Sequence, residues 1–114
     1  DPLLRQAGRA LAERSGKSET ALVLTDRRTV ELGAANNFEQ PDLFFHANRR
    51  GRVIPLDHLT EAGLDRALAF DPAWYVHFTE AAARADPGHR RVIERRMKLV
   101  IDRPGYQIYR VKKL

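Results

Sequence analysis

The spacing of apolar residues predicts alternating helices and strands along the chain. After an Asp1-Pro2 start, Leu4, Ala7 and Leu11 recur at helical spacing and predict a helix over 2–14 that stops at Ser15-Gly16. The predicted elements after it are a strand over 21–25, a helix over 29–37, strands over 43–47 and 52–54, a helix over 58–69, a strand over 73–78, a helix over 86–97, and strands over 98–101 and 107–111.

This order of elements predicts the fold class. Alternating helices and strands favour a parallel sheet covered by helices, whereas the two adjoining strands at the end favour an antiparallel hairpin around Arg103-Pro104-Gly105. We therefore expect an α/β fold, a three-layer sandwich with a mostly parallel, Rossmann-like sheet and an antiparallel C-terminal edge hairpin. Trp74, Val76 and Phe78 alternate along one strand and should share one face. No internal repeat or linker interrupts residues 1–114, which predicts a single domain.

Composition agrees with one globular domain. The chain has 114 residues, 43% hydrophobic and 31% charged, which is ample for one core and argues against disorder. No apolar run approaches the ~20 residues of a membrane-spanning helix, so the sequence predicts a soluble piece. The absence of cysteine excludes disulfides, thiol catalysis and cysteine-ligated zinc. Because the sequence begins with Asp-Pro, we expect a processed product or a piece of a longer protein.

Basic residues outnumber acidic ones by 20 to 15, giving a net charge of +5. This balance favours polyanionic partners such as nucleic acid, anionic lipid head groups or phosphorylated substrates, although genome base composition alone also enriches arginine. The first basic cluster is a predicted tight turn between two strands. Its anion-binding candidates are Asn48, Arg49, Arg50 and Arg52.

A second basic cluster lies on the predicted helix over 86–97. Arg91 and Arg95 are four residues apart and share a helix face with Lys98, and their guanidinium groups suit phosphate oxygens. The alternative interpretation is a solvated face with salt bridges to Glu94 and its neighbours.

One carboxylate has a suggestive position. Asp26 directly follows a predicted buried strand, and open α/β sheets bind ligands outside the carboxyl ends of their strands. The competing interpretation is that Thr25-Asp26 caps the next helix.

Other signatures of catalysis or cofactor binding are missing from the sequence. The four histidines at 46, 58, 77 and 89 show neither helical metal-clamp spacing nor an HExxH motif, although His46 and His77 would approach each other on neighbouring strands. Neither GxGxxG nor a P-loop occurs, and Ser15-Gly16-Lys17-Ser18 precedes a strand instead of following one. We predict no metal, no cofactor and no catalytic residue.

The order of several segments carries a family resemblance. ALVLTD, VELGAANNF, PDLFFHANRRGRVIP, AWYVHF and YQIYRV follow one another with helices between them. This arrangement resembles the soluble C-terminal domain of polytopic membrane glycosyltransferases related to dolichyl-phosphate-mannose protein mannosyltransferases and their bacterial relatives.

The resemblance implies an accessory, extracytoplasmic domain of an enzyme that uses a polyprenyl-phosphate-linked sugar donor. In such enzymes the catalytic acid lies in a loop between membrane helices, so no residue of this chain would be catalytic. The implied partners are the membrane-embedded remainder of the same chain, anionic lipid head groups or a glycan acceptor. Two alternatives stay open: a basic nucleic-acid-binding module, and a small α/β binder of nucleotides or sugar phosphates that uses Asp26.

Overall fold

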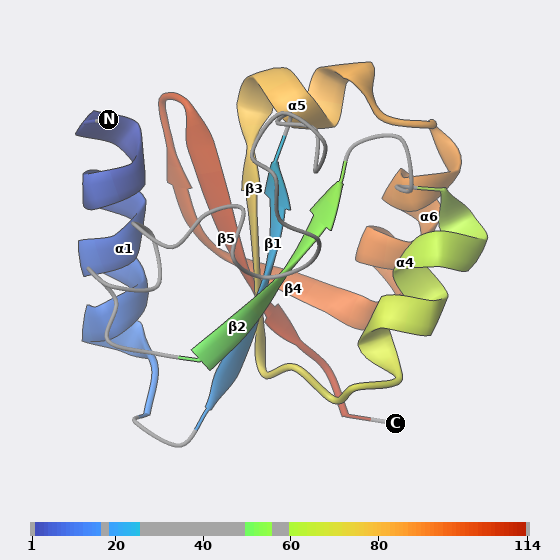
Figure 1. Cartoon of the computed structure of the whole chain (residues 1–114), viewed down its shortest axis with the longest axis horizontal. Helices are drawn as coiled ribbons and strands as arrows, with labels where there is room; N and C mark the ends of the chain where they lie inside the picture. The colour runs from blue at the N-terminus through green and yellow to red at the C-terminus, as the bar shows by residue number, and fades with distance from the viewer. Residues whose placement is uncertain (1, 17–18, 26–49, 56–59, 114) are drawn as a thin grey trace.

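The computed structural model describes residues 2–16, 19–25, 50–55 and 60–113 (Figure 1). The elements in these ranges are α1 (Pro2–Arg14), β1 (Thr20–Thr25), β2 (Arg50–Pro55), α4 (Glu61–Leu68), β3 (Trp74–Phe78), α5 (Thr79–Arg84), α6 (Gly88–Arg96), β4 (Met97–Arg103) and β5 (Tyr106–Val111). The helix predicted over 29–37 and the strand predicted over 43–47 lie outside the described residues.

The strands form one mixed sheet in the order β2-β1-β3-β5-β4. Strand β1 is parallel to both β2 and β3, whereas β5 is antiparallel to β3 and β4. The α/β class and the antiparallel C-terminal hairpin at a sheet edge are therefore confirmed. The described part of the sheet is parallel in one half and antiparallel in the other.

Alternation along the strands divides the core between the two faces of the sheet. Ala7 and Leu11 of α1 pack against one face, where they meet Trp74 and Val76 of β3. Tyr75, between these two strand residues, is buried on the other face with residues of α4, α5 and α6. Figure 1 shows α1 on one side of the sheet and α4 and α6 on the other. The prediction that Trp74, Val76 and Phe78 share a face is confirmed.

Local hydrogen bonds explain where the helices begin. The Thr60 hydroxyl accepts a hydrogen bond of 3.0 Å from the Gly63 amide and so caps α4. Asp86 accepts one of 2.7 Å from the amide of Gly88, the first residue of α6. Both helices are shorter than predicted, and Met97 is the first residue of β4 instead of a helical residue.

Two further predictions need correction. Helix α5 was not expected, because TEAAAR is too short to show a helical period. Strand β2 begins at Arg50, so it includes the predicted strand over 52–54, and Arg50 and Gly51 of the predicted turn belong to the strand as well. No helix among the described residues is long and apolar enough to cross a membrane.

The edge strand β4 contains an irregularity that reverses which face its side chains take. Leu99 pairs with Tyr109 and Ile101 with Ile108, so the register shifts by one residue at Val100. Val100 and Ile101 consequently both pack on the α1 side of the sheet. The next residue, Asp102, then turns to the opposite face, as expected after a β-bulge.

Glu19 connects the end of α1 with the sheet. Its Oε1 atom accepts hydrogen bonds from the Gly16 amide at 2.7 Å and the Trp74 indole at 3.0 Å, and its Oε2 atom lies 2.7 Å from the Arg110 guanidinium. The same guanidinium lies 4.9 Å from the centre of the Trp74 ring. These contacts, with the Gly16 hydrogen bond first among them, lower the pKa of Glu19 to about 2.

Candidate functional site

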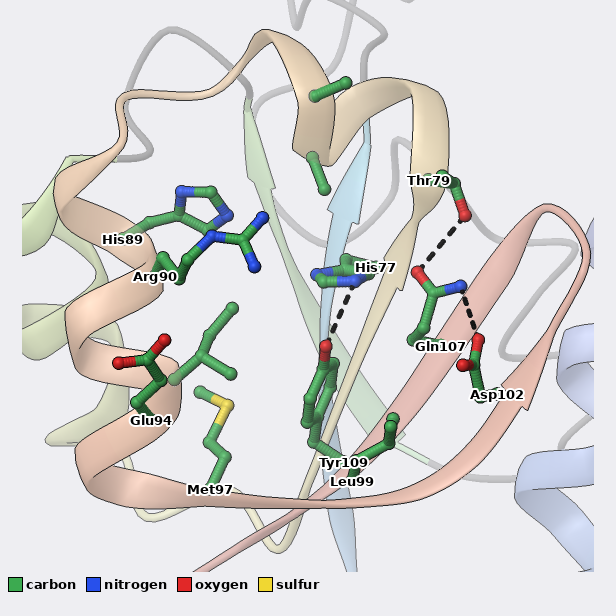
Figure 2. Close-up of a pocket in the computed structure, with 13 residues that line it drawn as sticks. His77, Thr79, His89, Arg90, Glu94, Met97, Leu99, Asp102, Gln107 and Tyr109 are labelled. Carbon is green, nitrogen blue, oxygen red and sulfur yellow. Dashed lines mark hydrogen bonds between the residues drawn. The ribbon is translucent and has the colours of Figure 1, made fainter.

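A pocket of about 510 Å³ lies between α5 and α6 on one side and the antiparallel half of the sheet on the other (Figure 2). Its volume is within the range of ~300–1,000 Å³ that is common for small-molecule sites. His77 near the carboxyl end of β3 and Thr79 directly after that strand both line it. The pocket therefore reaches the carboxyl end of β3, the strand end beside which open α/β sheets commonly bind ligands.

Cross-strand pairing builds the floor of the pocket. Gln107 of β5 pairs with His77 of β3 on one side and with Asp102 of β4 on the other, so the three residues form a row across the sheet. Tyr109 and Leu99 form a second row two residues along. All five residues line the pocket, and Asp102 does so only because the bulge at Val100 turns it to this face.

Helix α6 supplies the opposite wall. Figure 2 shows His89 and Arg90 projecting from it toward the sheet residues, and Glu94 of the same helix also lines the pocket. His89 is buried, and its Nδ1 atom lies 2.6 Å from the carbonyl oxygen of Asp86. Because a carbonyl oxygen only accepts, Nδ1 carries the proton of this hydrogen bond.

Hydrogen bonds orient the polar groups of the floor. The Thr79 hydroxyl donates to Oε1 of Gln107 at 3.1 Å, and Nε2 of Gln107 donates to Oδ1 of Asp102 at 3.0 Å. The Tyr109 hydroxyl lies 3.4 Å from Nε2 of His77. The Asp102 carboxylate, at the end of this row of hydrogen bonds, accepts from Gln107 and is exposed, so a ligand in the pocket can reach it.

Burial keeps the aromatic floor residues neutral near pH 7. It lowers the pKa of His77 to about 4, with Arg90 acting in the same direction and the Gln107 side chain in the opposite one. Burial also raises the pKa of Tyr109 and of its cross-strand neighbour Tyr75. The His77 ring contacts both tyrosines, at centroid distances of 5.6 Å to Tyr75 and 5.1 Å to Tyr109.

Of the seven predicted binding residues, the structure describes the side chains of Arg91 and Arg95, and neither lines this pocket. Asp26, Asn48 and Arg49 lie outside the described residues, and for Arg50 and Arg52 the structure describes the backbone in β2. The structure therefore does not test the predicted basic turn as an anion site. His46, the predicted neighbour of His77, also lies outside the described residues.

Arg91 and Arg95 form ion pairs with α4, although both side chains stay more than half exposed. A guanidinium nitrogen of Arg91 lies 2.8 Å from Glu61, and one of Arg95 lies 3.0 Å from Asp65. This arrangement supports the interpretation of the stripe as a face with salt bridges, with partners on α4 instead of Glu94. The sequence carried a signal for it, because Glu61 and Asp65 have the same spacing of four residues as the arginines.

Sequence reasoning missed the residues that make the pocket. His77 and His89 were considered only as metal ligands and Glu94 only as a salt-bridge partner of the arginines, and Asp102, Gln107 and Tyr109 were not singled out. Gln107 and Tyr109 alternate along one strand, but their proximity to His77 depends on β5 pairing with β3, which no local pattern shows.

Among the described residues, no group of three histidine or carboxylate side chains is placed to hold a metal ion. No family model, curated protein or solved structure matches this chain. The assignment of function therefore depends on the pocket and on the sequence resemblance.

Proposed function

We propose that this chain is an accessory, non-catalytic ligand-binding domain on the extracytoplasmic face of a membrane glycosyltransferase that uses a polyprenyl-phosphate-linked sugar. The order of sequence segments supports the glycosyltransferase origin. The observation that carries the ligand-binding role is the pocket of about 510 Å³ between α6 and the β4–β5 hairpin.

The protonation states of the floor favour binding over catalysis. A phenolate nucleophile needs a lowered tyrosine pKa, yet burial raises the pKa of Tyr109. A histidine that exchanges protons efficiently needs a pKa near the working pH, whereas that of His77 is about 4. Near pH 7 both residues are neutral hydrogen-bonding groups, which suits recognition of an uncharged ligand.

The proposal includes a three-layer, Rossmann-like arrangement in which the pocket lies over the antiparallel half of the sheet and reaches the carboxyl end of β3. Support comes from the two separate cores, one under α1 and one under α4, α5 and α6. The nucleic-acid alternative has less support, because Glu61 and Asp65 partly neutralise the arginine stripe.

The glycosyltransferase origin is tested by reading the genomic sequence on the 5′ side of the Asp1 codon. We expect the same reading frame to encode several apolar runs of ~20 residues. A start codon directly before Asp1, with no such runs upstream, would refute the origin.

The accessory role is tested in the intact protein encoded by that frame. Sugar transfer from a polyprenyl-phosphate donor is measured in membranes that contain the wild-type protein, the Asp102→Asn variant or the control variant Glu13→Gln. Glu13 is an exposed residue of α1. We expect Asp102→Asn to raise the apparent KM for the acceptor while kcat stays within about twofold, because a binding group outside the reaction centre contributes uniform binding. Loss of kcat with an unchanged KM would contradict a non-catalytic role.

A further inference from the structure

We propose that the pocket binds an uncharged sugar unit, with Asp102 as its main hydrogen-bond acceptor and Leu99 and Tyr109 as its apolar contact. The inference deepens the proposed function, since it rests on the pocket being a binding site and names the class of ligand.

The charges around the pocket argue against an anionic ligand. Two carboxylates, Glu94 and Asp102, line it together with one guanidinium, that of Arg90. His77 adds no positive charge near pH 7, because burial holds it in the neutral form. A phosphate would therefore meet two like charges with a single cation to offset them. Sugar hydroxyls, in contrast, both donate to carboxylates and accept from a guanidinium.

The floor offers an oriented acceptor at one end. Gln107 donates from Nε2 to Oδ1 of Asp102 and accepts from Thr79, so its amide and the carboxylate are fixed relative to each other. An oriented carboxylate can accept from two neighbouring hydroxyls, and hydrogen bonds to a charged acceptor are the strong ones. The bulge at Val100 is what places Asp102 here, and β-bulges often re-aim a side chain beside a functional site.

The same floor offers an apolar contact beside that acceptor. Leu99 is 47% exposed although it lines the pocket, and its cross-strand partner is Tyr109. Figure 2 shows these two side chains next to each other on the sheet side of the pocket. A pyranose ring has one face made mainly of C–H groups, so it would cover Leu99 and Tyr109 while its hydroxyls reach Asp102 and Arg90.

The test is a titration of the ¹⁵N-labelled chain, followed by amide chemical shifts. The neutral probes are the methyl glycosides of glucose, galactose and mannose. Inorganic phosphate and mannose 1-phosphate are the charged ligands for comparison. At least one neutral glycoside should shift the amides around His77, Asp102 and Tyr109 in a saturable manner. Asp102→Asn and Leu99→Ala should each weaken its binding by about tenfold, from loss of one charged hydrogen bond and of the apolar contact.

Matched controls separate binding from folding. Glu13→Gln removes one carboxylate from α1, on the other face of the sheet, and should leave the affinity unchanged. Circular dichroism must show that each variant folds, and Leu99→Ala is expected to fold because nearly half of the Leu99 side chain is exposed.

Three outcomes would overturn the inference. These are the absence of saturable shifts with every neutral glycoside, equal affinity for glycoside in Asp102→Asn and wild type, and pocket shifts produced by inorganic phosphate alone. Failure here is distinguishable from failure of the proposed function, because the upstream reading frame and the transfer assay are independent of glycoside binding to the isolated chain.

Discussion

Replacing Glu19 with glutamine should destabilise the fold in a pH-dependent way. The wild-type carboxylate accepts from the Gly16 amide and the Trp74 indole and pairs with Arg110, which together lower its pKa from 4.5 to about 2. At ~1.4 kcal/mol per pKa unit, this shift corresponds to an upper limit of ~3.5 kcal/mol. Because the Arg110 side chain is 41% exposed, solvent screens the ion pair, and we expect somewhat less than half of this value, ~1.5 kcal/mol.

The sign of the pH dependence follows from the lowered pKa. The charged form of Glu19 stabilises the fold fully above pH 4.5, and this contribution disappears as pH falls toward 2. Glu19→Gln lacks the contribution at every pH, so the stability difference between wild type and variant should shrink on acidification. Roughly half of it should be lost by pH 3.

Urea unfolding at pH 6 and pH 3 measures both quantities. At pH 6 the variant should unfold with a free energy ~1.5 kcal/mol lower than wild type, equivalent to a fall in Tm of about 6 °C for a chain of this size. Glu13→Gln, an exposed change on α1, is the control for loss of one negative charge. The reasoning is refuted if the difference for Glu19→Gln is absent at pH 6, or is as large at pH 3 as at pH 6.

Three further predictions concern other parts of the fold. The ring signals of His77 should titrate by NMR with a midpoint near pH 4, and a midpoint near 6.5 would contradict its burial. Because the unfolded state binds the histidine proton more readily than the folded state does, this residue should lower the free energy of unfolding as pH falls from 6.5 toward 4. Gly105→Ala should lower the free energy of unfolding in urea by about 1–3 kcal/mol, because Gly105 has a φ of +97° and a new Cβ would lie 2.6 Å from Leu3. The control Gly16→Ala should lower it by less, because its new Cβ would meet only ordinary contacts at 3.5 Å. Glu61→Gln should change stability by less than about 1 kcal/mol, since its arginine partners on α6 are exposed; a larger loss would show that these ion pairs hold α4 against α6.

Elements with a clear local pattern could be predicted from the sequence. Strand β3 alternates Trp74, Tyr75 and Val76 between the two faces, and the closing hairpin has a Pro-Gly turn between apolar runs. Helix α6 follows Asp86-Pro87, and the Asp86 carboxylate accepts a hydrogen bond from the amide of Gly88, the first residue of the helix. In each case the information lies within a few consecutive residues.

The pocket could not be predicted, because its geometry depends on pairing between distant strands. Gln107 meets His77 only because β5 lies between β3 and β4, an order that hydrophobic periodicity does not encode. The bulge at Val100 has no sequence signal either, since no glycine marks it. Without the bulge, a regular strand would turn Asp102 away from the pocket. The pairing of strands distant in sequence therefore determines the pocket, whereas local sequence patterns determine the individual helices and strands.

The core under α1 joins the first helix of the chain to its last strand. Ala7 and Leu11 pack with Tyr106 and Ile108, which the ribosome adds about a hundred residues later. The two α1 residues therefore cannot be fully buried before those later residues have been synthesised. Contacts of such sequence separation form late and slowly. During translation the apolar face of α1 therefore stays without these partners until the C-terminal hairpin emerges, and over that interval it is available to chaperones.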